Sequence, residues 1–178
     1  MEFNYLFKTA QDVKDFNMLA SHLLLDSSFK YDGYEEWIYD VALPELIGGY
    51  KKCIVAFSGE RSERKLVANL IYQPHKQFPR VREFKNMRIH PEVENRFFMP
   101  FMLRQGEKED ENDYDALICD VPWYKIKVIN TLKVNGWEEL MRAPIYGSNI
   151  VDVVMVKRFE RTPSGFFVPI MDKMRSIA

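Results

Sequence analysis

The sequence has few of the residues from which metal and redox sites are built. Its 178 residues include two cysteines and three histidines, and the histidines lie far apart with no metal-ligand spacing. Cys53 and Cys119 each lie within an apolar run, which favours two buried thiols over a disulfide or a zinc site. We therefore expect no bound metal.

Long apolar stretches and targeting segments are also missing. No run approaches 18 uninterrupted apolar residues, and the first four residues show no basic region followed by an apolar one. These absences predict no membrane association and a cytoplasmic location. The net charge of −1 argues against a protein that coats nucleic acid, although a local basic face could still bind an anion.

Several well-known catalytic motifs do not occur. We find no Gly-x-Ser-x-Gly, no Walker loop, no dinucleotide fingerprint, no His-Glu-x-x-His and no Cys-x-x-Cys. This disfavours hydrolases, kinases and dehydrogenases that depend on those motifs.

The residues that are present predict one globular α/β domain, residues 1–159, followed by a tail, residues 160–178. Hydrophobic residues make up 47% and charged residues 29%, which is an ordinary globular balance. Apolar periodicity predicts seven strands, at 2–9, 52–57, 65–72, 81–90, 114–121, 137–143 and 151–159. It predicts four helices, at 11–25, 34–47, 100–108 and 125–133.

The order of these elements predicts a mixed sheet with helices on both faces. Residues 52–72 are typical of a hairpin, whereas the strand–helix–strand order of the second half requires a parallel pair with a crossover helix. We expect Pro44 to break its helix or start a new one, Pro100 to open the next helix, and the acidic segment 107–115 to be a solvated loop. The tail carries an apolar stripe that we expect to pack on its own domain, or else on a partner.

This order resembles the GNAT (N-acetyltransferase) superfamily over residues 1–159. Residues 83–91, Glu-Phe-Lys-Asn-Met-Arg-Ile-His-Pro, look like the family's central strand. Residues 91–103 stand where the family has its CoA loop and the following helix, and 114–137 end in Asn-Gly-Trp, similar to the family's Gly-Phe ending. The resemblance implies a twisted sheet of about seven strands and, in an active member, N-acyl transfer from acetyl-CoA or another acyl-CoA.

The CoA loop departs from the family pattern, Gln/Arg-x-x-Gly-x-Gly/Ala. Small residues in that pattern let the backbone approach the pyrophosphate, and N–H groups at the helix start bind the anion. Here Glu94 puts a negative charge at the first position, Phe97 and Met99 replace the small residues, and Pro100 removes one N–H donor. Arg96 could still meet a phosphate.

The catalytic positions are also altered. Leu132 stands where many members have a tyrosine as general acid, and Tyr124 is the nearest candidate although its spacing is wrong. Glu83 stands where many members have an acid that serves as general base. The alternative for Glu83 is a carboxylate that only pairs with a neighbouring base, which would be Arg82, Lys85 or Arg88.

Three hypotheses of function follow. The favoured one is a catalytically degenerate GNAT-like domain that needs no cofactor and binds a protein or anionic partner. The second is an active N-acyltransferase with Glu83 as base, in which the acyl-CoA contacts would be Met87, Ile89, Arg96, Phe97, Phe98 and Met99. The third is an adaptor acting through the basic segment 76–88, for which nucleic acid would be a weak candidate partner. The apolar run from Phe97 to Met102 either fills the vacant CoA groove or docks a protein partner or a second copy of the chain.

Overall fold

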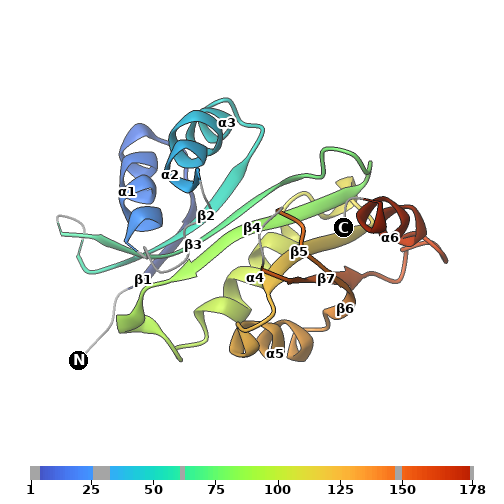
Figure 1. Cartoon of the computed structure of the whole chain (residues 1–178). Coiled ribbons are helices and arrows are strands. Elements are labelled where there is room, and N and C mark those ends of the chain that lie inside the picture. Colours follow the sequence, from blue (N-terminus) through green and yellow to red (C-terminus); the bar gives the residue numbers. More distant parts are fainter. Residues whose placement is uncertain (1–4, 26–32, 61–62, 147–149, 177–178) are drawn as a thin grey trace. The chain divides into compact units, whose positions relative to one another are not determined.

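The computed structural model describes residues 5–25, 33–60, 63–146 and 150–176 (Figure 1). Within these residues seven strands form a mixed sheet in the order β1-β2-β3-β4-β5-β7-β6. The strands are β1 (Tyr5–Thr9), β2 (Lys52–Ser58), β3 (Lys65–Pro74), β4 (Val81–Ile89), β5 (Ala116–Pro122), β6 (Glu138–Ala143) and β7 (Asp152–Arg158). The predicted fold class is confirmed.

The longer helices of the described chain are α1 (Val13–Leu24), α4 (Phe98–Lys108), α5 (Ile126–Val134) and α6 (Val168–Arg175). A further helical stretch consists of α2 (Tyr34–Glu36), the π-helical segment η2 (Trp37–Ala42) and α3 (Leu43–Ile47). Two 3₁₀ turns are η3 (Pro91–Val93) and η4 (Glu111–Asp113). No helix among the described residues has both the length and the apolar character needed to cross a membrane.

The chain divides into two compact units, 1–73 with 86–106, and 74–85 with 107–178. In the first, β2 and β3 pair antiparallel as the predicted hairpin, and β1 pairs antiparallel with β2. Helices α1, α2 and α3 lie together beside these strands (Figure 1). Leu19 and Leu23 of α1 and Ile38 of η2 are fully buried with Cys53 and Val55 of β2. The 3.6-residue spacing of the helix and the alternation of the strand bring these side chains into one core.

Two prolines lie in the first turns of helices. This position suits proline because the first residues of a helix do not need a backbone N–H group for helical hydrogen bonds. Pro44 lies in the first turn of α3, directly after the π-helical segment, so the predicted new helical start is observed. The predicted start of the next helix at Pro100 is wrong by two residues, because α4 begins at Phe98. Pro100 is still inside the first turn, where a backbone N–H group would have no partner within the helix, so the lack of this group in proline costs nothing there.

In the second unit β5 is the central strand. It runs parallel to β4, where Val81–Glu83 pair with Ala116–Ile118, and antiparallel to β7 along its whole length, while β6 pairs with β7. A second core joins Val154 and Val156 of β7 with Phe167 and Ile170 of the C-terminal segment. At the end of α5 Gly136 has φ of 83°, a left-handed conformation that suits glycine, as the Asn-Gly pair predicts.

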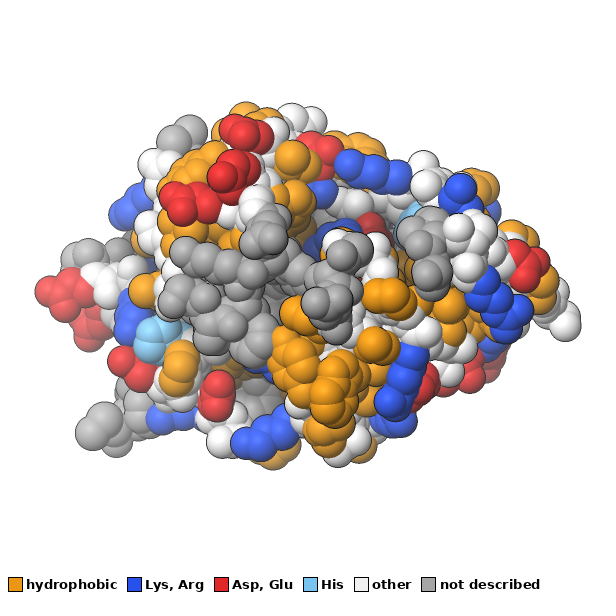
Figure 2. Space-filling view, viewed as in Figure 1, with side chains coloured by type: hydrophobic (Ala, Val, Ile, Leu, Met, Phe, Trp, Pro, Cys, Tyr) orange, Lys and Arg blue, Asp and Glu red, His pale blue; other side chains and the backbone are white. Residues whose placement is uncertain are grey.

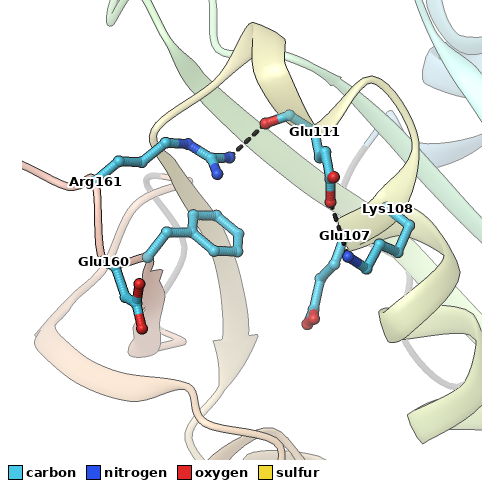
Figure 3. Close-up of a pocket in the computed structure, with 6 residues that line it drawn as sticks. Glu107, Lys108, Glu111, Glu160 and Arg161 are labelled. Atoms are coloured by element: carbon cyan, nitrogen blue, oxygen red, sulfur yellow. Dashed lines mark hydrogen bonds and ion pairs between the residues drawn. The ribbon is translucent and has the colours of Figure 1, made fainter.

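The prediction that residues 107–115 form a solvated acidic loop is wrong for Glu107 and Asp115, which are shielded, whereas Asp110 and Asp113 are exposed as predicted. Glu107 Oε2 lies 2.7 Å from Lys157 Nζ, and Asp115 accepts hydrogen bonds of 2.6 and 2.7 Å from Arg80. Figure 3 shows Glu107, Lys108 and Glu111 lining a pocket of about 370 Å³, with Lys108 paired to Glu111. Acids of this segment therefore balance bases of the same unit.

Candidate active site

Two acids, a lysine and a tyrosine come together in the second unit. We call Glu83 and Lys85 of β4, Asp120 of β5 and Tyr146, which follows β6, the carboxylate cluster. Lys85 Nζ lies 2.8 Å from Glu83 Oε1 and 4.0 Å from Asp120 Oδ1. The Lys85 ammonium also donates to the Tyr146 hydroxyl at 3.2 Å, and that hydroxyl donates to Asp120 Oδ2 at 2.9 Å.

The parallel pairing of β4 with β5 produces this arrangement. Glu83 is opposite Ile118, and residues two apart on a strand share a face, so Lys85 and Asp120 follow on neighbouring strands. The three charged members are largely shielded, since the Glu83, Lys85 and Asp120 side chains are 15%, 21% and 21% exposed, whereas Tyr146 is 44% exposed. The predicted pairing of Glu83 with a neighbouring base is therefore observed with Lys85.

The Asp120 carboxyl is the group whose ionisation this setting disturbs most clearly. Burial raises its pKa from the usual 3.8, and the charge of Glu83 raises it further, while Lys85 and the hydrogen bond from Tyr146 oppose the rise. Two carboxylates around one ammonium would carry a net charge of −1 when both are ionised. The cluster therefore favours a proton or another cation.

His75 is a second titratable neighbour that the sequence did not mark. Burial lowers its pKa, and both Glu83 and Lys85 act on it electrostatically. Its Nδ1 accepts the N–H groups of Gln77 and Phe78, at 3.1 and 3.2 Å, which fixes the ring in the turn after β3.

The sequence pointed to Glu83, and to Lys85 as one of three bases that could pair with it, but not to Asp120 and Tyr146 as companions. One signal was available for Asp120, which is the charged residue inside the otherwise apolar run Ala-Leu-Ile-Cys-Asp-Val. A polar residue in a buried strand needs a partner. Tyr146 carried no such signal, because its contact depends on the path of the chain after β6.

The other predicted acid–base positions lie elsewhere in the same unit. Tyr124 is in the turn after β5, next to Trp123, with a ring-to-ring distance of 6.0 Å. Its pKa is raised by burial and by the charge of Asp152. Leu132 is buried in α5 with 2% of its surface exposed, so it fills the core and offers no proton.

In the first unit the turn between η3 and α4, residues 94–97, adopts an unusual backbone. Asn95 and Phe97 have φ of 63° and 61°, in the left-handed region that glycine enters freely and phenylalanine does not. The sequence comparison predicts that Phe97 replaces a small residue, and its backbone has a conformation that glycine adopts readily. Arg96 donates to the Tyr5 hydroxyl at 2.6 Å, and the Glu94 side chain is exposed.

The bulky residues after this turn divide between core and surface. Phe98 is 4% exposed and packs edge-on against Tyr5, with ring centroids 4.9 Å apart, and against Phe7 at 5.3 Å. Phe97 and Phe101 are 81% and 45% exposed. The run therefore contributes both to the core of its unit and to its surface, while Met99 is half-buried.

The predicted acyl contacts Met87 and Ile89 are half-buried residues of β4, beyond a break in its regular conformation. Asn86 has φ of 45°, and its carbonyl accepts a 2.6 Å hydrogen bond from the fully buried side chain of Asn69. A left-handed residue changes the direction in which a strand presents its groups. The hydrogen bond from the Asn69 side chain stabilises this left-handed conformation of Asn86.

The basic segment 76–88 is not a bare positive face. Arg80 pairs with Asp115, Arg82 lies 3.5 Å from Asp110 and stacks 4.1 Å from the Tyr114 ring, and Lys85 belongs to the carboxylate cluster. On the face shown in Figure 2, Lys and Arg side chains are scattered among hydrophobic and acidic ones. Acids of the same unit therefore pair with these basic side chains and balance their charge.

The described residues contain no cluster of three or more His, Cys, Asp or Glu side chains that could hold a metal ion. Cys53 and Cys119 are buried free thiols, as predicted, and burial raises the pKa of both. The two thiols belong to different units.

Comparison with known proteins identifies the fold. No family model and no curated protein matches this sequence. Among solved structures, the ribosomal-protein-S18-alanine N-acetyltransferase of Escherichia coli matches with a TM-score of 0.67 at 11% identity, over 90% of this chain and 98% of that one. A GNAT-family acetyltransferase of Streptococcus pneumoniae gives 0.65 at 13% identity, over 88% and 100%.

An IAA acetyltransferase of Bacillus cereus gives a TM-score of 0.64 at 9% identity, covering 88% of this chain and all of the other. These identities are too low to transfer an activity, but the likeness extends over nearly the whole of each chain. The chain has the fold of the GNAT acetyltransferases.

Proposed function

We propose that this chain is an N-acyltransferase that transfers an acyl group from an acyl-CoA to an amine, with Glu83 accepting the proton of the amine. The observation that carries the proposal is the carboxylate cluster. In a chain with this fold, Glu83 lies on β4 within a shielded group of side chains whose net charge favours a cation.

An amine is protonated at neutral pH and must lose a proton before its nitrogen can attack a carbonyl carbon. The neutral nitrogen then forms the C–N bond as the thioester C–S bond breaks, and the departing CoA thiolate takes up the second proton that the nitrogen releases. The first proton, lost from the ammonium, needs an acceptor on the protein. The Glu83 carboxylate can take it, while Lys85 and Tyr146 keep the cluster in place. Asp120, whose pKa is raised, offers a second carboxyl beside the same ammonium.

The turn at residues 94–97 supports an acyl-CoA donor through its backbone. Asn95 and Phe97 adopt left-handed conformations, and the first N–H groups of α4 have no partner within the helix. Such groups bind phosphate oxygens, so the N–H groups of Phe98 and Met99 are the ones that would hold the diphosphate, with Arg96 beside them. The acyl-CoA supplies the activated acyl group.

A second candidate is a degenerate domain that binds a protein or anionic partner without catalysis. The exposed acid Glu94, the exposed ring of Phe97 and the buried Leu132 favour it. Each of them removes a feature that the family's phosphate loop or general acid supplies.

Calorimetric titration of the full chain with CoA and acetyl-CoA, followed by acyl transfer to a panel of amines, separates the two candidates. The proposal expects micromolar CoA binding that weakens in Arg96→Gln, and turnover that is lost in Glu83→Gln while CoA binding is kept. Absence of both CoA binding and turnover would support the degenerate domain and overturn the proposal. CoA binding without turnover for any acyl-CoA and amine would contradict acyl transfer and would also contradict the loss of the CoA site.

A further inference from the structure

An amine of the protein itself lies within hydrogen-bond distance of the proposed base. Lys85 Nζ is 2.8 Å from Glu83 Oε1, and the two residues lie on one face of β4. The Lys85 side chain is 21% exposed and that of Glu83 is 15% exposed, so neither is sealed in the core. An external amine must bring its nitrogen to this same carboxylate before it can give up a proton. Lys85 therefore occupies, within the protein, the position that the proposed reaction requires of a substrate amine.

Two further contacts of the Lys85 ammonium are longer than this ion pair. The Tyr146 hydroxyl accepts a hydrogen bond from Nζ at 3.2 Å, and Asp120 Oδ1 is 4.0 Å away. Tyr146 is 44% exposed, so water reaches this part of the cluster. An acyl donor whose carbonyl carbon can reach an amine at Glu83 can, for the same reason, reach Lys85 Nζ. A group held beside its reaction partner reacts far faster than one that must arrive from solution.

We propose that Lys85 is itself an acyl acceptor, so that the chain transfers an acyl group from acyl-CoA to its own carboxylate cluster. The proposal rests on the proposed function, because it uses the same base and the same donor. Glu83 takes one proton from the ammonium, and the neutral Nζ forms a C–N bond with the acyl carbon as the thioester C–S bond breaks. The CoA thiolate leaves with the second proton that the nitrogen releases. The product is a neutral amide that keeps one N–H group.

Acylation of Lys85 changes the charge of the carboxylate cluster. The amide has no positive charge, so the ion pair with Glu83 is lost. Lys85 also opposes the rise in the pKa of Asp120, and after acylation it no longer does so. Two neighbouring carboxylates without an ammonium beside them favour a bound cation, which a protonated amine substrate supplies. The modified chain should therefore bind such an amine more tightly than the unmodified chain does.

The test is incubation of the full chain with acetyl-CoA and no added amine. Digestion and mass spectrometry of the peptides then give a rate of acetylation for each lysine. We expect one acetyl group on Lys85, at a rate that saturates with acetyl-CoA and does not depend on the concentration of the chain, as a reaction within one molecule requires. Glu83→Gln should slow this rate by about 10²–10⁴-fold, the usual contribution of a positioned base, while CoA binding is kept.

Lys108 is the control for direct chemical acetylation. It also pairs with a glutamate, Glu111 at 3.0 Å, but its side chain is 78% exposed and lies outside the carboxylate cluster. It should react slowly, and equally in the wild type and in Glu83→Gln. Lys85→Arg keeps a positive charge and should lose only the acetyl group at position 85. The acetylated wild type should have a KM for an amine substrate about tenfold below that of Lys85→Arg, which is equivalent to about 1.4 kcal/mol.

Acetylation of Lys85 that is no faster than that of Lys108, or equally fast in Glu83→Gln, would overturn the proposal. Turnover of added amines while Lys85 stays unmodified would also overturn it, and the proposed function would then stand. If neither Lys85 nor any added amine is acylated, both fail. Acetylation of Lys85 without turnover of any added amine would support the proposal and limit the proposed function to the chain's own amine. Equal KM values for the acetylated chain and Lys85→Arg would overturn the effect on substrate binding.

Discussion

Glu83 and Lys85 lie two residues apart on β4 with their charged atoms 2.8 Å from each other. Because residues two apart on a strand point to the same face, the strand itself holds this pair together. An amine substrate that approaches Glu83 therefore meets a carboxylate already next to a positive charge. Its binding must compete with Lys85 or use Asp120, 4.0 Å from the same ammonium.

Replacing Glu83 by Gln should abolish most of the acyl transfer. If Glu83 takes the proton of the amine, kcat should fall by about 10²–10⁴-fold, the usual contribution of a positioned base. The KM for acyl-CoA should stay unchanged. Initial rates with a saturating amine measure both values.

Glu92→Gln is the matched control for that variant, because Glu92 is also paired with a lysine but is 66% exposed. It should keep full activity. Equal rates for the wild type and Glu83→Gln would show that another group accepts the proton.

The Asp120 carboxyl should make stability fall as pH rises. Its pKa is raised above 3.8, so the folded state holds this proton more tightly than the unfolded state does. Its contribution to the free energy of unfolding is complete below pH 3.8 and is lost as pH rises through the raised pKa. Asp120→Asn should therefore gain stability relative to the wild type as pH rises, measured by urea unfolding across the acidic range.

Asp115→Asn should show the opposite trend. The hydrogen bond from Arg80 lowers the pKa of Asp115, so the contribution of Asp115 grows as pH rises. The variant should lose stability relative to the wild type over the same range. Parallel curves for both variants would contradict the assignment.

The inner face of α1 should be sensitive to loss of volume. Leu19 is fully buried in the core of the first unit, and Leu19→Ala should lower the free energy of unfolding by about 2–5 kcal/mol. Leu25, directly after α1, is 66% exposed, and Leu25→Ala should change it by no more than about 0.5 kcal/mol. Urea denaturation followed by circular dichroism distinguishes them, and similar losses would mean that α1 packs through another face.

Phe97 should be replaceable by glycine without loss of stability. The ring is 81% exposed and the residue has φ of 61°, so Phe97→Gly relieves left-handed strain of about 1–2 kcal/mol against a somewhat smaller entropic cost. Phe98→Ala, at the buried neighbour, should lose about 3–5 kcal/mol. Thermal or urea unfolding measures both, and a large loss in Phe97→Gly would show that the ring makes a necessary contact.

The same glycine variant also tests the phosphate turn. If the backbone there holds the diphosphate, Phe97→Gly should bind CoA at least as tightly as the wild type in a calorimetric titration. Weaker binding would indicate that the phenylalanine ring itself contacts the ligand.

Much of the fold could be predicted from the sequence because its signals are local. The apolar patterns of 52–57 and 65–72 each lie within one strand. The connection between the two strands is short, so it favours a hairpin. Gly136 marks the end of α5 because only a residue free of Cβ strain suits a φ of 83°. The start of α4 was predicted at the wrong residue because proline can occupy any of the first three positions of a helix. Pro100 is the third residue of α4 and not the first.

The candidate site was predicted at Glu83 and, among three possible bases, at Lys85. Its neighbours Asp120 and Tyr146 join it through the register of β4 with β5 and through the path after β6, which no single stretch encodes. The left-handed conformation of Phe97 was missed for another reason. Phenylalanine avoids that conformation, so the residue type argued for a different turn, whereas the fold imposed this one.

The C-terminal helix has a consequence for how this chain can be handled. Phe167 and Ile170 are buried against Val154 and Val156, and Arg158 stacks 4.5 Å from the Phe167 ring. A protein shortened at residue 160 would expose an apolar, valine-rich strand surface to water. Such surfaces pair with one another, so the shortened protein should precipitate or form soluble aggregates when expressed, and affinity tags belong beyond Arg175.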